Sequence, residues 1–431
     1  MKAVGIICEY NPFHLGHARH IEKTKQAVGD DCVIVCVMSG NYVQRGDFAV
    51  FNKHSRAEAA VFCGADLVIE LPTPYALSSA EGFAKAGVYL LENTGICDYI
   101  SFGSESGDIE VLKNIAGGLA TPEADDLTRK WLKEGLPYAS ARQNAISDML
   151  GAEANILKKA NNLLGVEYLN AISALNSTLR PIVIKRTGGE HDGDFGYSAS
   201  RIRKMLTNEE FEKKCLSKPN DTQLHSIEGG MTAAENQAGK WISLSVPLPA
   251  WNTFKKEIAE GRGPVSMKRC ESAILSRLRS IAHASKLSHV SEGLGNRFIR
   301  YARTEPTIDG ILTKTKTKRY TMSRLRRLLL CACLNIPEED TNLPPPYIRV
   351  LAMNQVGMIA LKEMRGKTKL PIITKPALAH SLDSRQSRMF SNEVSATDFF
   401  ILAYPDIQQR LGGAEWRTSP KVVKSMSVQI S

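Results

Sequence analysis

The chain has 431 residues, 43% of them hydrophobic, and a formal net charge of +10 at pH 7. This length exceeds what one ordinary hydrophobic core organises and predicts two domains, while no apolar run approaches the roughly 20 residues that a membrane span needs. None of the nine cysteines forms a C-x-x-C pair, so we expect reduced core thiols in a cytoplasmic protein rather than disulfides or a zinc site.

The charge is unevenly distributed along the chain. Residues 1–200 carry 18 lysines and arginines against 24 aspartates and glutamates, whereas residues 201–431 carry 37 against 21. The two parts therefore have net charges of −6 and +16. This asymmetry predicts one domain for chemistry and one that holds a polyanion, with nucleic acid as the leading partner. A basic surface that is merely solvated remains the alternative.

Strand and helix patterns alternate in the first half of the chain. Continuous β-branched strands separated by helices predict a Rossmann-like, doubly wound parallel sheet covered on both faces, with ligands bound beyond the carboxyl ends of the strands. The expected strands are 3–8, 32–38, 67–71, 99–102 and 181–185. The expected helices are 16–28, 55–63, 79–92 and 162–175.

The loop after the first strand carries the sequence His14-Leu15-Gly16-His17. A strand end, an Asn-Pro turn and a helix N-terminus together form an anion site. Gly16 would allow backbone to approach phosphate, and the two imidazoles could donate hydrogen bonds to charge developing on it. We therefore predict attack on the α-phosphate of a nucleoside triphosphate. Zinc bound by His14, His17 and His20, or purely structural histidines, are the alternatives.

Two further segments of the first half border the expected crevice. The polar loop 39–52 follows the second strand, and Lys53 and Arg56 share the next helix face, where both could meet an anionic substrate or leaving group. A solvated helix start is the alternative for this pair. Gly103 ends the fourth strand and could let an adenosine pack against bare backbone.

The segment Ser198-Ala199-Ser200-Arg201-Ile202-Arg203 predicts a helix start. The hydroxyl groups can cap the helix, and the planar guanidinium of Arg203 could then reach phosphate oxygens. Taken alone, the pattern also suits an ordinary helix cap.

Helical patterns dominate after about residue 210, over 265–283, 294–302 and 323–334. We therefore divide the chain into a catalytic α/β domain, 1–210, and a mainly helical basic domain, 211–431. In the basic domain, the densest clusters of lysine and arginine lie on either side of Tyr320. This arrangement suits a phosphate backbone and one stacked base, although single basic residues could be solvated. The predicted nucleic-acid-binding residues are Arg297, Arg300, Lys316, Lys318, Arg319, Arg324 and Arg327.

On these motifs, the chain resembles the bacterial tRNA(Met) cytidine acetate ligase family of the HxGH nucleotidyltransferase superfamily. The segments that carry the resemblance are GIICEYNPFHLGHARH (5–20), MSGNYVQRGDFAVFNKHSRAEAA (38–60), GADLVIELPTPYALSSAEGFA (64–84), FGSES (102–106), NNLLGVEYL (161–169), Arg186 with Gly188, SASRIR (198–203), GLGNRF (293–298), KRYTMSRLRR (318–327) and PPYIRVLAMN (345–354). They span nearly the whole chain, and residues 38–84 are far more specific to the family than the His-x-Gly-His tetrad.

The resemblance implies a ligase that works in two steps. Acetate attacks the α-phosphate of ATP to give acetyl-adenylate and pyrophosphate, and the acetyl group then passes to N4 of the wobble cytidine of elongator tRNA(Met). ATP is the expected nucleotide, and magnesium would suit its triphosphate, although no carboxylate cluster requires a metal. The alternatives are a small-molecule nucleotidyltransferase, or an acyl-adenylating enzyme like citrate lyase ligase, and a non-catalytic RNA-binding protein that senses ATP.

The site residues divide by role. His14 and His17 would stabilise phosphate charge, while Lys53, Arg56, Arg186 and Arg203 would position acetate or pyrophosphate. The expected ATP-binding residues are Ile7, Cys8, Glu9, Tyr10, Asn11, Pro12, Phe13, His14, Leu15, Gly16, His17, Ala18, Arg19, His20, Gly103, Asn161 or Asn162, Arg186, Ser198 and Arg203. The chain departs from the family pattern at Asn170, where lysine is commoner, and at Ser200, where threonine is commoner.

Overall fold

The computed structural model describes residues 2–186, 198–208, 242, 244–283, 290 and 293–424. Gly188 and Cys215 lie outside these residues. The eight cysteines that the structure describes are free thiols. Among the described helices, none is both long and apolar enough to cross a bilayer.

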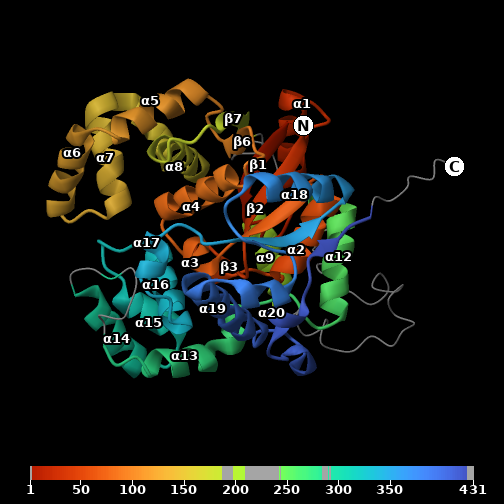
Figure 1. Cartoon of the computed structure of the whole chain (residues 1–431). Helices are drawn as coiled ribbons and strands as arrows, with labels where there is room; N and C mark the ends of the chain where they lie inside the picture. Colours follow the sequence, from red (N-terminus) through yellow and green to blue (C-terminus); the bar gives the residue numbers. More distant parts are fainter. Residues whose placement is uncertain are drawn as a thin grey trace.

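The centre of the molecule is a parallel sheet (Figure 1). Its order is β5-β2-β1-β6-β7, and every neighbouring pair in that series is parallel. The bounds are β1 (Ala3–Cys8), β2 (Val33–Ser39), β5 (Leu67–Leu71), β6 (Tyr99–Ser104) and β7 (Arg180–Lys185). From β1 the chain moves outward to β2 and β5 and then returns to the other side of β1 with β6. This reversal places the binding crevice at the carboxyl ends of β1 and β6.

The two faces of the sheet bury alternate residues of each strand. On β2, Val33, Val35 and Val37 enter one core, whereas Ile34 and Cys36 enter the other. One face is covered by α4 (Ala80–Asn93), α8 (Ala160–Ala174) and α18 (Gln355–Lys367). The other is covered by α1 (Leu15–Val28), α2 (Lys53–Phe62), α9 (Ala199–Leu206) and α12 (Leu248–Ala259). The predicted doubly wound sheet is confirmed, since burial on both faces requires its near-continuous apolar strands.

The sheet continues into the basic half of the chain. β8 (Ile348–Met353) pairs antiparallel with β5, and β9 (Ile372–Ile373) and β10 (Lys421–Val422) pair parallel with β8. These strands were not expected in the mainly helical segment. The division at residue 210 stays a prediction, and one sheet crosses it.

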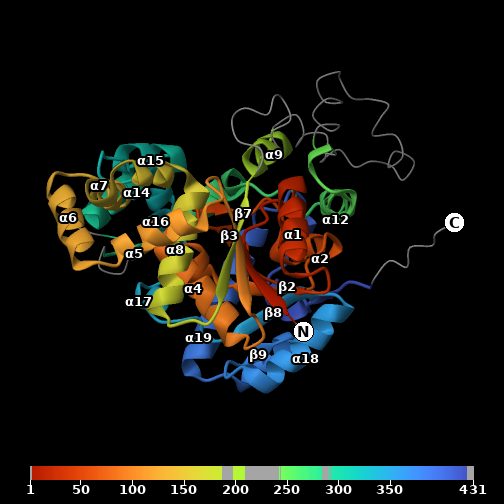
Figure 2. The ribbon, with the colours of Figure 1, turned by 90° about the horizontal axis from the view of Figure 1, so that it is seen from above.

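Seven further helices form two groups on the same side of the sheet (Figures 1 and 2). We call the first the helical arm, α5 (Ile109–Leu119), α6 (Pro122–Lys133) and α7 (Tyr138–Leu150). We call the second the basic bundle, α13 (Glu271–Arg279), α14 (Leu294–Thr304), α15 (Ile308–Thr315) and α16 (Met322–Leu334). Shorter or later helices are α3 (Thr73–Ala76), α17 (Glu339–Asn342), α19 (Ser384–Ile401) and α20 (Ala414–Arg417).

A hairpin in the loop after β2 joins the sheet to the basic bundle. It consists of β3 (Tyr42–Val43) and β4 (Asp47–Phe48), and its two aromatic side chains lie in the core of the bundle. Gly46 turns the hairpin with φ +74°, and a Cβ there would lie 2.5 Å from the backbone nitrogen of Arg327 on α16. Only glycine permits this close approach.

Candidate functional site

The two histidines of the tetrad cap helix α1 together. His14 Nδ1 accepts a hydrogen bond from the Gly16 amide at 3.0 Å, and His17 Nδ1 accepts one from the His14 amide at 3.2 Å. Their rings stack at a centroid distance of 3.8 Å. A Cβ at Gly16 would lie 2.8 Å from His14 Cε1, so this glycine makes room for the His14 ring. Because each Nδ1 accepts, a neutral ring must carry its proton on Nε2 and can donate only from there.

Burial keeps these histidines neutral. It lowers the pKa of His14 to about 4 and that of His20 to about 4, and it lowers the pKa of His17 well below its ordinary value. The nearby positive charge of Arg186 acts in the same direction on all three. Neutral imidazoles can donate hydrogen bonds to developing phosphate charge without first losing a proton.

A cavity of about 970 Å³ opens at the carboxyl ends of β1 and β6. Half of the predicted loop lines it, namely Ile7, Cys8, Glu9, Tyr10, Asn11, His17 and His20. Gly103, Asn161, Arg186 and Arg203 line it as well. The Arg203 guanidinium donates to the Asn11 carbonyl at 2.6 Å, which ties the start of α9 to the first loop.

The other predicted ATP-binding residues lie outside the cavity lining. They are Pro12, Phe13, His14, Leu15, Gly16, Ala18, Arg19, Asn162 and Ser198. Phe13 is fully buried, and the Ser198 hydroxyl caps α9 by accepting from the Arg201 amide at 3.2 Å. His14 acts on the cavity through His17, whose ring it stacks against.

The neighbouring asparagines 161 and 162 differ in role. Asn162 is 2% exposed, and its Oδ1 accepts from the Ser104 hydroxyl and from the amides of Glu105 and Ser106. It therefore organises the loop after β6. Asn161 lines the cavity and donates to Glu105 Oε1 at 2.6 Å. Of the two, Asn161 is the residue that can meet a nucleotide.

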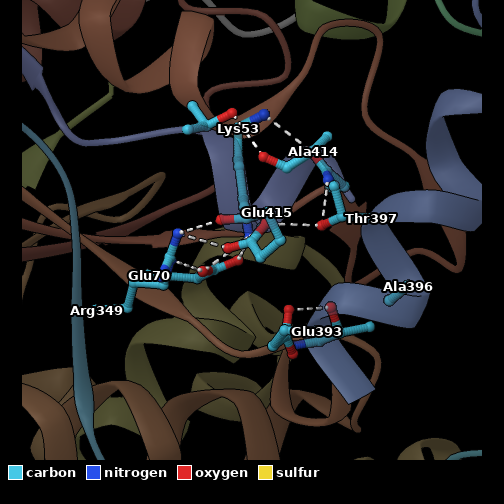
Figure 3. Close-up of polar contacts among 12 residues, drawn as sticks. Lys53, Glu70, Arg349, Glu393, Ala396, Thr397, Ala414 and Glu415 are labelled. Carbon is cyan, nitrogen blue, oxygen red and sulfur yellow. Dashed lines mark hydrogen bonds and ion pairs between the residues drawn. The ribbon is translucent and has the colours of Figure 1, made fainter. Parts of the chain in front are cut away.

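The structure corrects the expectation for Lys53, as Figure 3 shows. Its side chain is 1% exposed and lies outside the cavity lining. The ammonium group contacts Glu70 at 2.7 Å and Glu415 at 3.0 Å, and Glu415 also pairs with Arg349 at 2.8 Å. A buried ammonium group needs such carboxylates to offset its lost hydration. The ammonium group of Lys53 is therefore already paired and is not available to bind acetate.

The expectation that Arg56 touches the substrate is corrected as well. Its side chain is fully buried, and it donates to the backbone carbonyls of Phe51, Glu9, Ser39 and Gly40. Burial lowers its pKa to about 10, so it remains charged at neutral pH. Arg56 therefore fixes the loops that follow β1 and β2 and acts as a positioning residue.

The predicted nucleic-acid-binding residues fall into two sets. Arg319, Arg324 and Arg327 line the main cavity from the basic bundle. The others lie away from it: Lys316 and Lys318 are exposed, Arg297 donates to the carbonyls of Lys314 and Thr315, and Arg300 lines a second cavity of about 380 Å³. Tyr320 is 6% exposed and packs in the core of the bundle, so the interleaved tyrosine offers no open face for a base.

Several cavity residues were not among the predicted site residues. Gln44 and Arg45 belong to the loop that was expected to border the crevice, and both line it. Tyr138 and Arg142 on α7 and Glu167 on α8 also line the cavity. Glu167 belongs to the segment 161–169 but was not singled out there. No local pattern distinguishes Tyr138 and Arg142, because only the packing of the helical arm brings them to the site.

Metal binding has no ready donor set in the described part of the chain. No three His, Cys, Asp or Glu side chains there come together in a way that could hold an ion. His14 and His17 also use their Nδ1 atoms to accept from backbone amides.

The chain is similar over nearly its whole length to one group of proteins. The family model described as HIGH Nucleotidyl Transferase matches residues 1–415. A tRNA(Met) cytidine acetate ligase of Caldanaerobacter subterraneus subsp. tengcongensis is 38% identical over 415 residues, which cover 94% of this chain and 96% of the relative. One from Acetivibrio thermocellus is 33% identical over 431 residues, covering 96% and 98%.

Solved structures give the same result. Thermotoga maritima TmcAL bound with alpha-thio ATP superposes with a TM-score of 0.85 at 32% sequence identity, covering 99% of this chain and 100% of that one. Its apo form matches equally well. The similarity therefore extends through both the sheet and the basic bundle.

Proposed function

The chain belongs to the HIGH nucleotidyltransferase family and, within it, to the tRNA(Met) cytidine acetate ligases, and from this premise we propose its reaction. The protein is an ATP-dependent ligase. It activates acetate as acetyl-adenylate and transfers the acetyl group to N4 of the wobble cytidine of elongator tRNA(Met). We propose the cytoplasm as its location, in keeping with its free thiols.

The observation that carries this proposal is the shared cavity. His17, His20 and Arg203 line it from the nucleotide side, and Arg319 and Arg324 line it from the basic bundle. A small-molecule nucleotidyltransferase has no need for a cationic wall opposite its ATP site. An enzyme that acetylates tRNA needs such a wall, since the RNA acceptor must reach the acyl-adenylate where that intermediate forms.

In the first step, an acetate oxygen attacks the α-phosphorus of ATP, and pyrophosphate leaves. The Nε2–H group of His17 and the N-terminal dipole of α1 stabilise the growing negative charge. Arg186 and Arg203 are the cations that line the cavity close to the histidines, and we assign them to the phosphates. Magnesium would add charge neutralisation on the triphosphate.

In the second step, the cytidine N4 attacks the acetyl carbon, and AMP leaves. Both steps depend on orientation and electrostatics, without a covalent enzyme intermediate. Arg56 contributes by holding the carbonyls of Glu9 and Gly40, which fixes the walls between which the reactants lie.

The test is to incubate the protein with ATP and labelled acetate, with and without elongator tRNA(Met). Label entering the tRNA supports the ligase. Label confined to acetyl-adenylate indicates a small-molecule enzyme, and no labelled product indicates an RNA-binding protein. His17→Ala should abolish acetate-dependent ATP–pyrophosphate exchange while leaving tRNA binding intact, and retained exchange would contradict the role of His17.

A further inference from the structure

An ion pair between the helical arm and α8 lies in the cavity wall. Arg142 on α7 and Glu167 on α8 pair through Nη1 and Oε1 at 2.5 Å, and both line the cavity. The Arg142 guanidinium also lies over the Tyr138 ring at 5.7 Å. Tyr138 is 48% exposed and lines the same cavity, so one exposed aromatic ring lies beside the ion pair in the cavity wall.

Glu167 has unused hydrogen-bonding capacity. It is 3% exposed, and its Oε2 has no partner at hydrogen-bond distance among the described residues, although the Asn170 side chain on the same helix is near enough to lower the pKa of the carboxyl group. Burial raises the pKa of this carboxyl group, and Arg142 opposes the shift. A buried carboxylate oxygen without a partner is costly, and its position in a cavity wall indicates a donor group from a ligand.

We propose that Glu167 and Arg142 read the Watson–Crick edge of the acceptor cytosine, an inference that rests on the proposed function. Cytosine presents an N4 amine beside the N3 and O2 acceptors. Glu167 Oε2 accepts from N4, as carboxylates do at cytosine edges, and Arg142 donates to N3 or O2. The exposed Tyr138 ring stacks on the unpaired base, which is how single-stranded bases are held.

The Glu167–Arg142 pair would also reject uracil. Uracil places the O4 carbonyl where N4 stands, so O4 would face the Glu167 carboxylate, and its N3–H would face the Arg142 guanidinium. Both contacts are repulsive. A mismatched base edge of this kind costs about 1–3 kcal/mol, or roughly 5-fold to 150-fold in affinity.

Adenine has a similar amine and ring-nitrogen edge, so the base of ATP is the competing occupant. The position of the pair favours the RNA base. Asn161 and Gly103 mark the nucleotide side, whereas Glu167 lies six residues further along α8, about 9 Å along the helix axis. There the cavity wall is the helical arm, which stands on the same side of the sheet as the basic bundle with Arg319 and Arg324 (Figures 1 and 2).

The contact also provides a route for the amine proton. As N4 forms its bond to the acetyl carbon, the bond from that carbon to the adenylate oxygen breaks, and AMP leaves with the electron pair. The proton lost by N4 passes to Glu167 Oε2. The charged and titratable groups facing Glu167 are Arg142 and Tyr138 from α7 and Glu81 from α4, and the neutral Asn170 amide on its own helix favours the ionised carboxylate.

The test measures the two steps separately in the full-length enzyme. Glu167→Gln should keep acetate-dependent ATP–pyrophosphate exchange within about twofold, because the first step does not involve cytosine. It should slow acetyl transfer to tRNA by about 100-fold, a loss expected for a general base. Glu167→Asp, which keeps the charge and shortens the reach, should slow transfer by at least about tenfold with exchange intact, and it stands in if Glu167→Gln does not fold.

A matched control and a specificity measurement complete the design. Glu257 is 7% exposed and pairs with Arg262 at 2.7 Å, but it lies outside the cavity lining. Glu257→Gln should leave the ratio of transfer to exchange unchanged. Elongator tRNA(Met) transcripts with uridine at the wobble position should compete for the wild-type enzyme with an inhibition constant at least about fivefold above the Kd of the cytidine transcript. In Glu167→Gln the two constants should become equal.

Three outcomes would overturn the inference. The first is wild-type transfer by Glu167→Gln. The second is a fall in exchange with a raised KM for ATP, which would place adenine at the pair. The third is a parallel loss of both steps in Glu167→Asp, which would show a purely structural ion pair. Failure of the wild-type enzyme to label any tRNA would instead contradict the proposed function.

Discussion

At the scale of single residues, we expect the two adjacent asparagines to differ in role, one affecting ATP binding and the other affecting stability. Asn161→Ala removes a side chain from the cavity wall and should raise the KM for ATP in pyrophosphate exchange by about tenfold, with little change in stability. Asn162→Ala removes an acceptor for three donors, one of them buried and two part-buried, and should lower the free energy of unfolding by about 2–3 kcal/mol. Steady-state kinetics and urea denaturation of both variants check this division, and reversed effects would contradict it.

The buried histidines predict a loss of stability in acid. The folded-state pKa of His20 is about 4, below the ordinary value of about 6.5, so the unfolded chain binds its proton first as the pH falls. The free energy of unfolding should therefore fall between pH 6.5 and 4, by roughly 2–3 kcal/mol from this group. Urea denaturation of wild type and His20→Gln across this range isolates the contribution. Parallel pH profiles would show that His20 is not the cause.

Sequence patterns predicted the tetrad and its strand-to-helix setting, because both are local. They could not predict which cations touch substrate. Lys53 and Arg56 share the helix face with the expected spacing, yet Glu70 and Glu415 neutralise the lysine, and backbone carbonyls hold the arginine. Glu415 lies more than 350 residues away in the chain, so no local pattern reports this pairing.

At the scale of elements, the ion cluster in Figure 3 joins α2, β5, β8 and α20. Lys53→Met would leave two buried carboxylates to share Arg349, and we expect a loss of about 3–5 kcal/mol in the free energy of unfolding. Lys113→Met, which breaks an exposed pair with Glu110, should change it by less than about 1 kcal/mol.

Kinetics distinguish the structural from the chemical role of Lys53. The folded fraction of Lys53→Met should keep near wild-type pyrophosphate exchange per active site. An unchanged unfolding free energy combined with lost exchange would restore Lys53 as a substrate-binding residue.

The strands illustrate how far sequence patterns reach at this scale. β1 and β5 were predicted to the residue, because they are apolar runs bounded by a polar loop and a proline. β8 escaped prediction although each of β5 and β8 carries one charged residue. Arg349 of β8 is buried through carboxylates on β5 and α20, and no local pattern reports that long-range pairing. The antiparallel pairing of β8 with β5 is likewise a long-range event.

At the scale of the whole molecule, the basic half predicts salt-sensitive tRNA binding. Lys316 and Lys318 are exposed and lie off the cavity, so replacing both with glutamine should weaken tRNA binding. The slope of log Kd against log salt should decrease by about 0.7–0.9 for each RNA phosphate that the double variant no longer neutralises.

Filter binding across about 50–250 mM potassium chloride measures this slope. Lys362→Gln, an exposed lysine on α18 away from the basic bundle, is the matched control and should leave the slope unchanged. Exchange without tRNA should be unaffected in all these variants. An unaltered slope in the double variant would remove these lysines from the RNA surface.

The pairing of β8 with β5 has a consequence for biosynthesis. A ribosome releases β5 and its buried acid Glu70 long before it makes Ile348–Met353, and at about 5–20 residues per second the edge of the sheet stays open for tens of seconds. During that interval the nascent chain carries an unpaired strand edge, the kind of surface that recruits chaperones or aggregates. The sheet is therefore complete only after the segment that contains β8 has been synthesised.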